Sequence, residues 1–240
     1  DSGHLRITER QVGDWERPQF DRPKESGYTT ARTNSGATLE MAWFETLNTR
    51  PFRKTLVVTV SGGGLHPGEW IEVTYGDTSG GGPGRRAQTF REPQSEFHVL
   101  ADPFGANRFF PMADQPWVPV LGDDATEFEV TSPASAVTGR AHRLSVRARD
   151  QWGNTDERYA GEVSLWANLP VDGMPETASF RPSDRGLIEI GELIPREAGD
   201  LVFTATCEAP AAVSNSNPIR CTDEPEHWNL HWGDFHGQSR

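Results

Sequence analysis

The chain has 240 residues and a formal net charge of −12, from 35 acidic and 23 basic side chains. This length is long for one domain and comfortable for two, because domains cluster at roughly 100 to 150 residues. A nucleic-acid backbone or an anionic membrane surface requires clustered Lys and Arg, so the acidic balance and the lack of a basic stripe argue against both as partners.

No stretch approaches the roughly 20 apolar residues needed to span a bilayer, and the N-terminus lacks the basic-then-apolar pattern of a signal peptide. The sequence therefore predicts a soluble protein, either cytoplasmic or periplasmic. Because the first residue is Asp1 rather than Met, earlier removal of a targeting segment stays open, and the compartment stays open with it.

Composition and turn density predict an all-β protein. The chain holds 24 Gly and 18 Pro but 3 Met, and short β-rich segments separated by turn residues take the place of long helix-forming runs. We expect two tandem β-sandwich modules of the immunoglobulin-like kind. The predicted organisation is an extended N-terminal arm at 1–35, a β-sandwich module at 36–122, an immunoglobulin-like module at 123–222, and a linker with the first strand of a further domain at 223–240.

The N-terminal arm is predicted from its polarity. Residues 1–35 are charged, are interrupted by Pro18 and Pro23, and show no sustained apolar periodicity. We expect this segment to pack along the body of the protein, with Trp15 and Phe20 as its anchors.

Alternating apolar residues predict the strands of the module at 36–122, because a period of two places them on one face of a sheet. The alternating sets are Leu39, Met41 and Trp43; Leu56, Val58 and Val60; Ile71, Val73 and Tyr75; and Phe97 and Val99. Turn signals separate them, among them Pro67-Gly68 and Asp102-Pro103-Phe104-Gly105.

The glycine-rich segment Gly76–Arg86 allows two interpretations. The plain one is a flexible hairpin tip. In the other, successive backbone N–H groups and the two side chains Arg85 and Arg86 contact an anion, because Gly permits the positive φ that aligns such groups. The segment is no nucleotide P-loop, since it lacks the Gly-Lys-Ser/Thr ending and no amphipathic helix follows. Arg85 and Arg86 are therefore candidate contacts to an anionic substrate.

The module at 123–222 carries the same alternation. Leu144, Val146 and Ala148 precede the turn Asp150–Asn154, and this segment resembles the strand-and-turn signature of bacterial immunoglobulin-like and filamin-like domains. The resemblance implies rigid spacing or protein contact as its role. Further strands are predicted around Phe128 and Val130, Val163 and Leu165, Phe180, Ile188, Ile190, Leu193, Leu201 and Phe203.

The cysteines and tryptophans each leave an alternative open. Cys207 and Cys221 form a disulfide in an oxidising compartment, or stay as two thiols.

The eight tryptophans are dispersed and several alternate with core residues, so packing is favoured over a sugar-stacking platform. They are Trp15, Trp43, Trp70, Trp117, Trp152, Trp166, Trp228 and Trp232.

The last dozen residues concentrate groups able to bind a metal. Asp234 and His236 are two positions apart, so on an extended strand they emerge on one face, and Gln238 continues that row. A catalytic zinc takes about three protein ligands and a water, so these residues alone leave the shell incomplete. We expect a chain that ends as its metal site begins.

The run Trp232–Ser239, preceded by Ser216–Arg220, resembles a bacterial family known as a domain of unknown function, whose catalytic half is similar to the polymerase-and-histidinol-phosphatase (PHP) metallophosphoesterases. That superfamily opens its barrel with an Asp-x-His-x-His strand that binds a metal cluster. Asp234 and His236 match the Asp and the first His, and Gln238 stands at the second His. The resemblance implies zinc, manganese or iron in the full-length protein, none in this chain alone, and the remainder of its own catalytic domain as partner.

Two functions follow from these observations. The favoured one is the non-catalytic N-terminal scaffold of a metal-dependent, phosphoesterase-like hydrolase, inactive by itself, that contributes the first metal-ligand strand. The alternative is a carbohydrate-binding or adhesion β-sandwich module with no catalytic role. The sequence shows no Ser-His-Asp order, Cys-His pairing or Gly-x-Ser-x-Gly elbow for nucleophilic catalysis.

Overall fold

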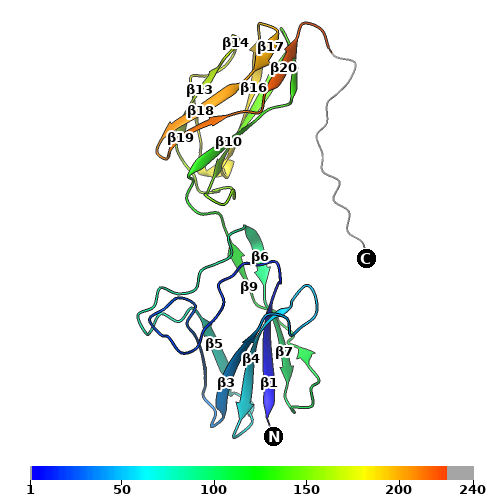
Figure 1. Ribbon diagram of the computed structural model, residues 1–240, viewed down its shortest axis with the longest axis vertical. Coiled ribbons are helices and arrows are strands. Elements are labelled where there is room, and N and C mark those ends of the chain that lie inside the picture. Colours follow the sequence, from blue (N-terminus) through cyan, green and yellow to red (C-terminus); the bar gives the residue numbers. More distant parts are fainter. Residues whose placement is uncertain (1, 226–240) are drawn as a thin grey trace. The chain divides into compact units, whose positions relative to one another are not determined.

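The computed structural model describes residues 2–225, and the chain divides into two compact units (Figure 1). The first module ends at Val120 and the second begins at Leu121, two residues before the predicted start at Asp123. The all-β prediction is confirmed: the one helical element among the described residues is a 3₁₀ turn at Pro182–Asp184. Each unit is a β-sandwich, as the turn density and the alternation indicated.

The first module contains nine strands in three sheets. They are β1 (Gly3–Glu9), β2 (Thr29–Thr33), β3 (Thr38–Phe44), β4 (Lys54–Ser61), β5 (Ile71–Tyr75), β6 (Glu92–Glu96), β7 (His98–Asp102), β8 (Phe110–Pro111) and β9 (Trp117–Val120). The largest sheet has the order β3-β4-β1-β7-β8, and two hairpin-like pairs, β2-β5 and β6-β9, complete the module. All of these pairings are antiparallel.

The core of the first module lies between the five-stranded sheet and the β2-β5 pair. Ile7, Leu56 and Val58 are buried there, and partly buried residues from both layers surround them, including Val73 on β5. Each strand supplies every second residue to this face, as expected for a pleated sheet with one face in the core.

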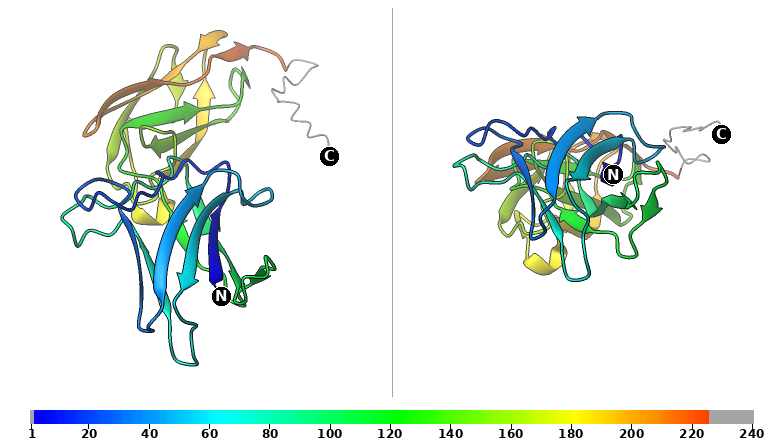
Figure 2. Two further views of the ribbon diagram at one scale, coloured as in Figure 1. Left: turned by 60° about the horizontal axis from the view of Figure 1, so that its bottom comes forward. Right: turned by 90° about the horizontal axis from the view of Figure 1, so that it is seen from below.

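The N-terminal residues differ from the predicted arm. Residues 3–9 form β1, which lies between β4 and β7 in the middle of the five-stranded sheet, and Figure 2 shows this dark blue strand beside the cyan β4. Thr29–Thr33 forms β2, which pairs with β5. Only the segment between β1 and β2 runs along the module as an arm. The prediction missed β1 because its apolar row holds two residues, Leu5 and Ile7, before a charged Glu9 takes the next position.

The described residues of the second module, 121–225, form eleven strands in three sheets. They are β10 (Glu127–Thr131), β11 (Ser135–Val137), β12 (His142–Arg149), β13 (Glu162–Ala167), β14 (Val171–Asp172), β15 (Thr177–Ser179), β16 (Leu187–Pro195), β17 (Gly199–Leu201), β18 (Phe203–Glu208), β19 (Ala211–Asn215) and β20 (Ile219–Thr222). Their orders are β10-β12-β16-β14, β15-β13-β18-β19 and β11-β20-β17, with β11 and β20 parallel.

Two facing four-stranded sheets enclose the core of the second module. Leu144 and Val146 of β12 face Val163 of β13 and Phe203 of β18, and all four are fully buried. The predicted alternation at 144–148 and 163–165 is therefore the inward face of two strands.

No helix in the described part of the chain is long and apolar enough to cross a membrane.

Candidate functional site

The predicted metal ligands Asp234, His236 and Gln238 lie outside the described residues, so the structure does not place them. Within residues 2–225, no group of three or more His, Cys, Asp or Glu side chains is arranged to hold a metal ion. The candidate contacts Arg85 and Arg86 are described, and they differ sharply in surroundings.

Arg85 is a buried cation. Its side chain is 4% exposed, and its Nη2 lies 2.9 Å from Oε2 of Glu9, which is 2% exposed. Nε donates a hydrogen bond of 2.6 Å to the backbone carbonyl oxygen of Glu16. The guanidinium carbon lies 4.6 Å from the ring centre of Tyr75 and 5.4 Å from that of Trp15, so two aromatic rings flank the charge.

Burial raises the pKa of the Glu9 carboxyl, and the hydrogen bond and charge of Arg85 oppose that rise. Oε1 of Glu9 has no hydrogen-bond partner within the described residues, and neither does the hydroxyl of Tyr75. Burial likewise raises the pKa of Tyr75. The site therefore joins the end of β1, the arm and the glycine-rich segment through one buried ion pair.

Arg86 lies at the surface. Its side chain is 54% exposed, and Nη1 is 3.8 Å from Oδ2 of Asp14, while Nη2 donates to the Asp14 carbonyl oxygen at 3.2 Å. Its backbone N–H donates to Glu16 Oε2 at 2.9 Å, which keeps the segment against the arm. Of the two candidate anion contacts, Arg86 presents its guanidinium to solvent.

The glycines of this segment serve close packing. A Cβ at Gly80 would lie 2.4 Å from Cβ of Pro23, and one at Gly82 would lie 2.8 Å from the Pro23 carbonyl oxygen. Gly76 has φ +65°, and a Cβ there would meet the backbone nitrogen of Arg85 at 2.5 Å. Because Gly80 and Gly82 have no side chains, Pro23 of the arm can pack directly against the backbone of this segment.

A second polar cluster holds the turn after β12. Asp150 is 1% exposed, and its carboxylate accepts hydrogen bonds from the backbone N–H groups of Asp123, Trp152 and Asn154 and from the Asn154 amide. Burial opposes ionisation of Asp150, but these hydrogen bonds outweigh it and lower the pKa. In the predicted signature, Asp150 and Asn154 therefore stabilise the turn after β12 through hydrogen bonds.

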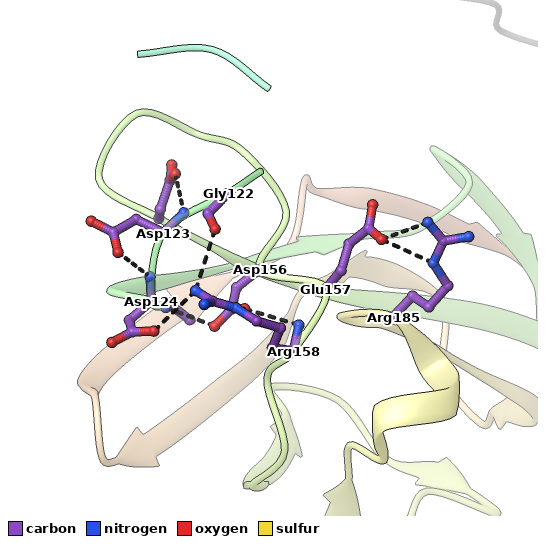
Figure 3. A network of polar contacts seen from close by, with 9 residues as sticks. Gly122, Asp123, Asp124, Asp156, Glu157, Arg158 and Arg185 are labelled. Atoms are coloured by element: carbon purple, nitrogen blue, oxygen red, sulfur yellow. Dashed lines mark hydrogen bonds and ion pairs between the residues drawn. The ribbon is translucent and has the colours of Figure 1, made fainter. Parts of the chain in front are cut away.

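Asp156 extends this cluster to the start of the module (Figure 3). Its carboxylate accepts from the backbone N–H of Ala125 at 3.1 Å and of Arg158 at 3.0 Å. Nη2 of Arg158 lies 3.2 Å from Oδ1 of Asp124 and 3.4 Å from the carbonyl oxygen of Gly122. The segment entering β10 is thereby tied to the turn that precedes β13.

Cys207 and Cys221 are both free thiols in the structure. Cys221 is buried within the core of the second module, and burial raises its pKa. Cys207 is half-buried on β18, where its Sγ lies 3.4 Å from the Tyr159 hydroxyl. Neither arrangement is that of an activated nucleophile, which needs a neighbouring cation or base.

Four of the six described tryptophans are exposed, contrary to the expected packing: Trp70, Trp117, Trp152 and Trp166. Trp166 shows why, because on β13 it alternates with buried Val163 and Leu165 and so faces outward. Tryptophan content alone does not distinguish the two faces of a strand.

Glu9 was not among the predicted site residues, although the sequence contains a signal for its burial. Leu5, Ile7 and Glu9 are spaced by two, so a strand that buries the first two directs the third toward the same face. A charge in that row needs a buried partner, because an unpaired buried charge is costly. The partner, Arg85, lies 76 residues further along the chain.

No protein-family model and no curated protein sequence matches the chain. Among the solved structures that resemble the chain is a β-glycosidase from Bacteroides vulgatus, with 13% sequence identity and a TM-score of 0.37 over 91% of this chain and 24% of that one. A glycosyl hydrolase family 2 member from Bacteroides cellulosilyticus has 8% identity and a TM-score of 0.38 over 91% of this chain and 28% of that one. The Escherichia coli adhesin FdeC has 14% identity and a TM-score of 0.32 over 92% of this chain and 62% of that one. The chain spans less than two thirds of each of these proteins.

Proposed function

We propose that this chain is the non-catalytic N-terminal scaffold of a metal-dependent, phosphoesterase-like hydrolase and supplies the first metal-ligand strand of that enzyme. The observation that carries the proposal is the spacing of Asp234, His236 and Gln238, which resembles the opening strand of the PHP metallophosphoesterases. A carboxylate, an imidazole and an amide oxygen form a donor set that suits zinc, manganese or iron.

The described residues support a structural role for the two modules. The buried charged side chains Glu9, Arg85 and Asp150 are engaged in fixing the arm and a turn. Each module has its own hydrophobic cluster. In the proposed enzyme, Asp234 and His236 would hold a divalent metal, and Gln238 would bind it or orient the substrate. The metal would supply Lewis-acid chemistry, which lowers the pKa of a bound water and polarises a phosphoryl oxygen.

The test uses the protein that the proposal describes, in which this chain is joined to a catalytic domain. Metal content is measured by plasma mass spectrometry, and turnover is measured with para-nitrophenyl phosphate. His236→Ala is expected to lower both metal content and kcat/KM by a factor on the order of 100. Gln238→His restores the second His of the resembling motif and is expected to raise metal affinity. Wild-type metal content and turnover in His236→Ala would contradict the proposal.

Arg86 remains a proposed contact to the anionic substrate. Because its guanidinium is exposed, Arg86→Met removes the charge without emptying a buried site. We expect a several-fold rise in KM with kcat unchanged, as for loss of an interaction made equally in ground and transition states. Arg32→Met is the matched control, since Arg32 is an exposed arginine of the same module. Equal effects of the two substitutions would remove Arg86 from the substrate site.

A carbohydrate-binding or adhesion module is the second candidate, and the exposed tryptophans favour it. Trp166 and Trp117 are each about half exposed, at 51% and 52%, and a planar exposed indole can stack on a pyranose ring. Titration with oligosaccharides under tryptophan fluorescence tests this reading. A saturable quench that Trp166→Ala or Trp117→Ala abolishes supports it, whereas an unchanged spectrum favours the scaffold.

A further inference from the structure

A pocket of about 230 Å³ lies on the outer face of the five-stranded sheet of the first module. Leu5 and Ile7 of β1 face the core, so His4 and Arg6 emerge on the opposite face. The loop between β3 and β4 and the loop between β7 and β8 border this face. The pocket is lined mainly by His4, Arg6, Phe44, Leu47, Val57 and Phe109.

Arg6 is the charged group of this pocket. Its guanidinium carbon lies 3.6 Å from the ring centre of Phe109, and its Nε is buried without a hydrogen-bond partner among residues 2–225. Burial lowers the pKa of Arg6, and the nearby carboxylate of Asp102 opposes that effect. Arginine stays protonated at neutral pH even so, because its ordinary pKa exceeds 12. A partly desolvated cation therefore lies at the pocket.

Asp102, the acidic residue whose charge acts on Arg6, stabilises the loop between β7 and β8. Asp102 is 1% exposed at the end of β7, and its carboxylate accepts from the backbone N–H of Ala106 at 3.1 Å and of Asn107 at 2.7 Å. These bonds hold the loop that carries Phe109 over Arg6. Asn107 has φ +55°, a conformation that Asn tolerates, and it also lines the pocket. The carboxylate shapes the pocket, and the donor capacity of Arg6 Nε stays unused.

We propose that this pocket, named here the Arg6 pocket, binds a small organic carboxylate. The guanidinium pairs with the carboxylate group, because its planar fork matches carboxylate geometry. Phe44, Leu47 and Val57 contact the apolar part of the ligand, which an inorganic anion lacks. A volume of about 230 Å³ equals that of roughly eight waters at about 30 Å³ each, so the pocket suits a body the size of one ring. The inference uses the first module alone and is independent of the proposed metal site.

Benzoate is the probe, tested on the 240-residue chain by NMR titration of the backbone amides. We expect a Kd on the order of 1 mM, as suits a ligand of this size, with shifts confined to β1, β4 and the Asp102–Phe109 loop. Benzyl alcohol, which keeps the ring and lacks the charge, is expected to bind at least tenfold more weakly. Inorganic phosphate is expected not to displace benzoate at equal concentration. Equal binding of benzyl alcohol, or displacement by phosphate, would overturn the proposed ligand class.

Substitutions locate the site. Arg6→Met is expected to weaken benzoate binding at least tenfold. The matched control is Arg32→Met, because Arg32 also lies over an aromatic ring, 5.8 Å from the centre of Trp70, but pairs with Glu72 at 2.7 Å. Phe44→Ala, at a side chain already 44% exposed, is a second variant that leaves the core intact, and a threefold or greater loss is expected. Wild-type affinity in either pocket variant, or equal loss in Arg32→Met, would refute the assignment.

Discussion

Replacing Arg85 by Met tests whether the buried ion pair with Glu9 holds the first module together. The substitution keeps most of the side-chain volume but removes the cation, the 2.9 Å contact to Glu9 and the hydrogen bond to Glu16. Removing one partner of a buried pair costs about 3–5 kcal/mol, because the other charge is left uncompensated. With few fully buried apolar residues in its core, this module has little reserve against such a loss.

The cost should depend on pH in a definite direction. Burial already raises the pKa of Glu9, and the lowering contribution of Arg85 disappears in the variant, so the folded pKa rises further. A carboxyl whose folded pKa lies above its unfolded value of about 4.3 destabilises the protein as pH rises through that interval. The penalty of Arg85→Met is therefore largest at neutral pH and shrinks toward pH 4, where Glu9 is folded in its neutral form.

The assay is urea unfolding of the 240-residue chain at pH 7 and near pH 4.5, with hydrogen–deuterium exchange of β1 and β12 reporting the two modules separately. Arg86→Met is the matched control, since the neighbouring arginine is exposed and its ion pair is worth at most about 1 kcal/mol. A cost below about 1 kcal/mol for Arg85→Met, or one independent of pH, would refute the reasoning.

Three further predictions concern the second module. Asp150→Ala leaves several backbone N–H groups of the turn without an acceptor and is expected to cost about 3 kcal/mol of unfolding free energy. Because hydrogen bonds lower the pKa of folded Asp150, its stabilising contribution is present above about pH 3.9 and is lost as the pH falls through the lower folded pKa. Urea unfolding at a series of pH values would show this loss. Leu144→Ala should cost about 2–5 kcal/mol in the same unfolding measurement, while Val213→Ala, at a side chain 74% exposed, should be neutral. Cys207 should react with a colorimetric thiol reagent well before the buried Cys221, as mass analysis of the labelled peptides would show.

Many strands were predictable because, along the core strands, buried apolar residues alternate with more exposed residues in the sequence. Leu56, Val58 and Val60 lie on β4, and Val163 and Leu165 lie on β13, all directed inward as expected. Alternation records which residues share a face, so it predicts a strand well wherever one face is apolar and the other polar. Strand pairing was not predictable in the same way, because strands that are neighbours in a sheet are often far apart in the sequence and no local pattern identifies the partner.

The failure at β1 has a physical reason. Its inward row is Leu5, Ile7 and Glu9, and the charge at the third position made the row look like the start of a polar arm. The opposite misjudgement occurred in the glycine-rich segment, where a flexible tip was the plain interpretation. Gly80 and Gly82 are required there by the approach of Pro23, a residue more than fifty positions earlier. Both errors arise because a contact distant in sequence decides the local environment.

The Glu9–Arg85 pair explains how a module with a small apolar core keeps one arrangement of its arm. The buried cluster of the first module contains Ile7, Leu56 and Val58, whereas that of the second contains fifteen residues. Apolar packing is non-directional, so a small core discriminates weakly between alternative positions of a polar, proline-containing segment. A buried guanidinium is different, because displacement of the arm from Arg85 would remove the Glu16 carbonyl from its Nε and leave that donor unpaired. The arm is therefore expected to be fixed by the geometry of one cation more than by the area it buries.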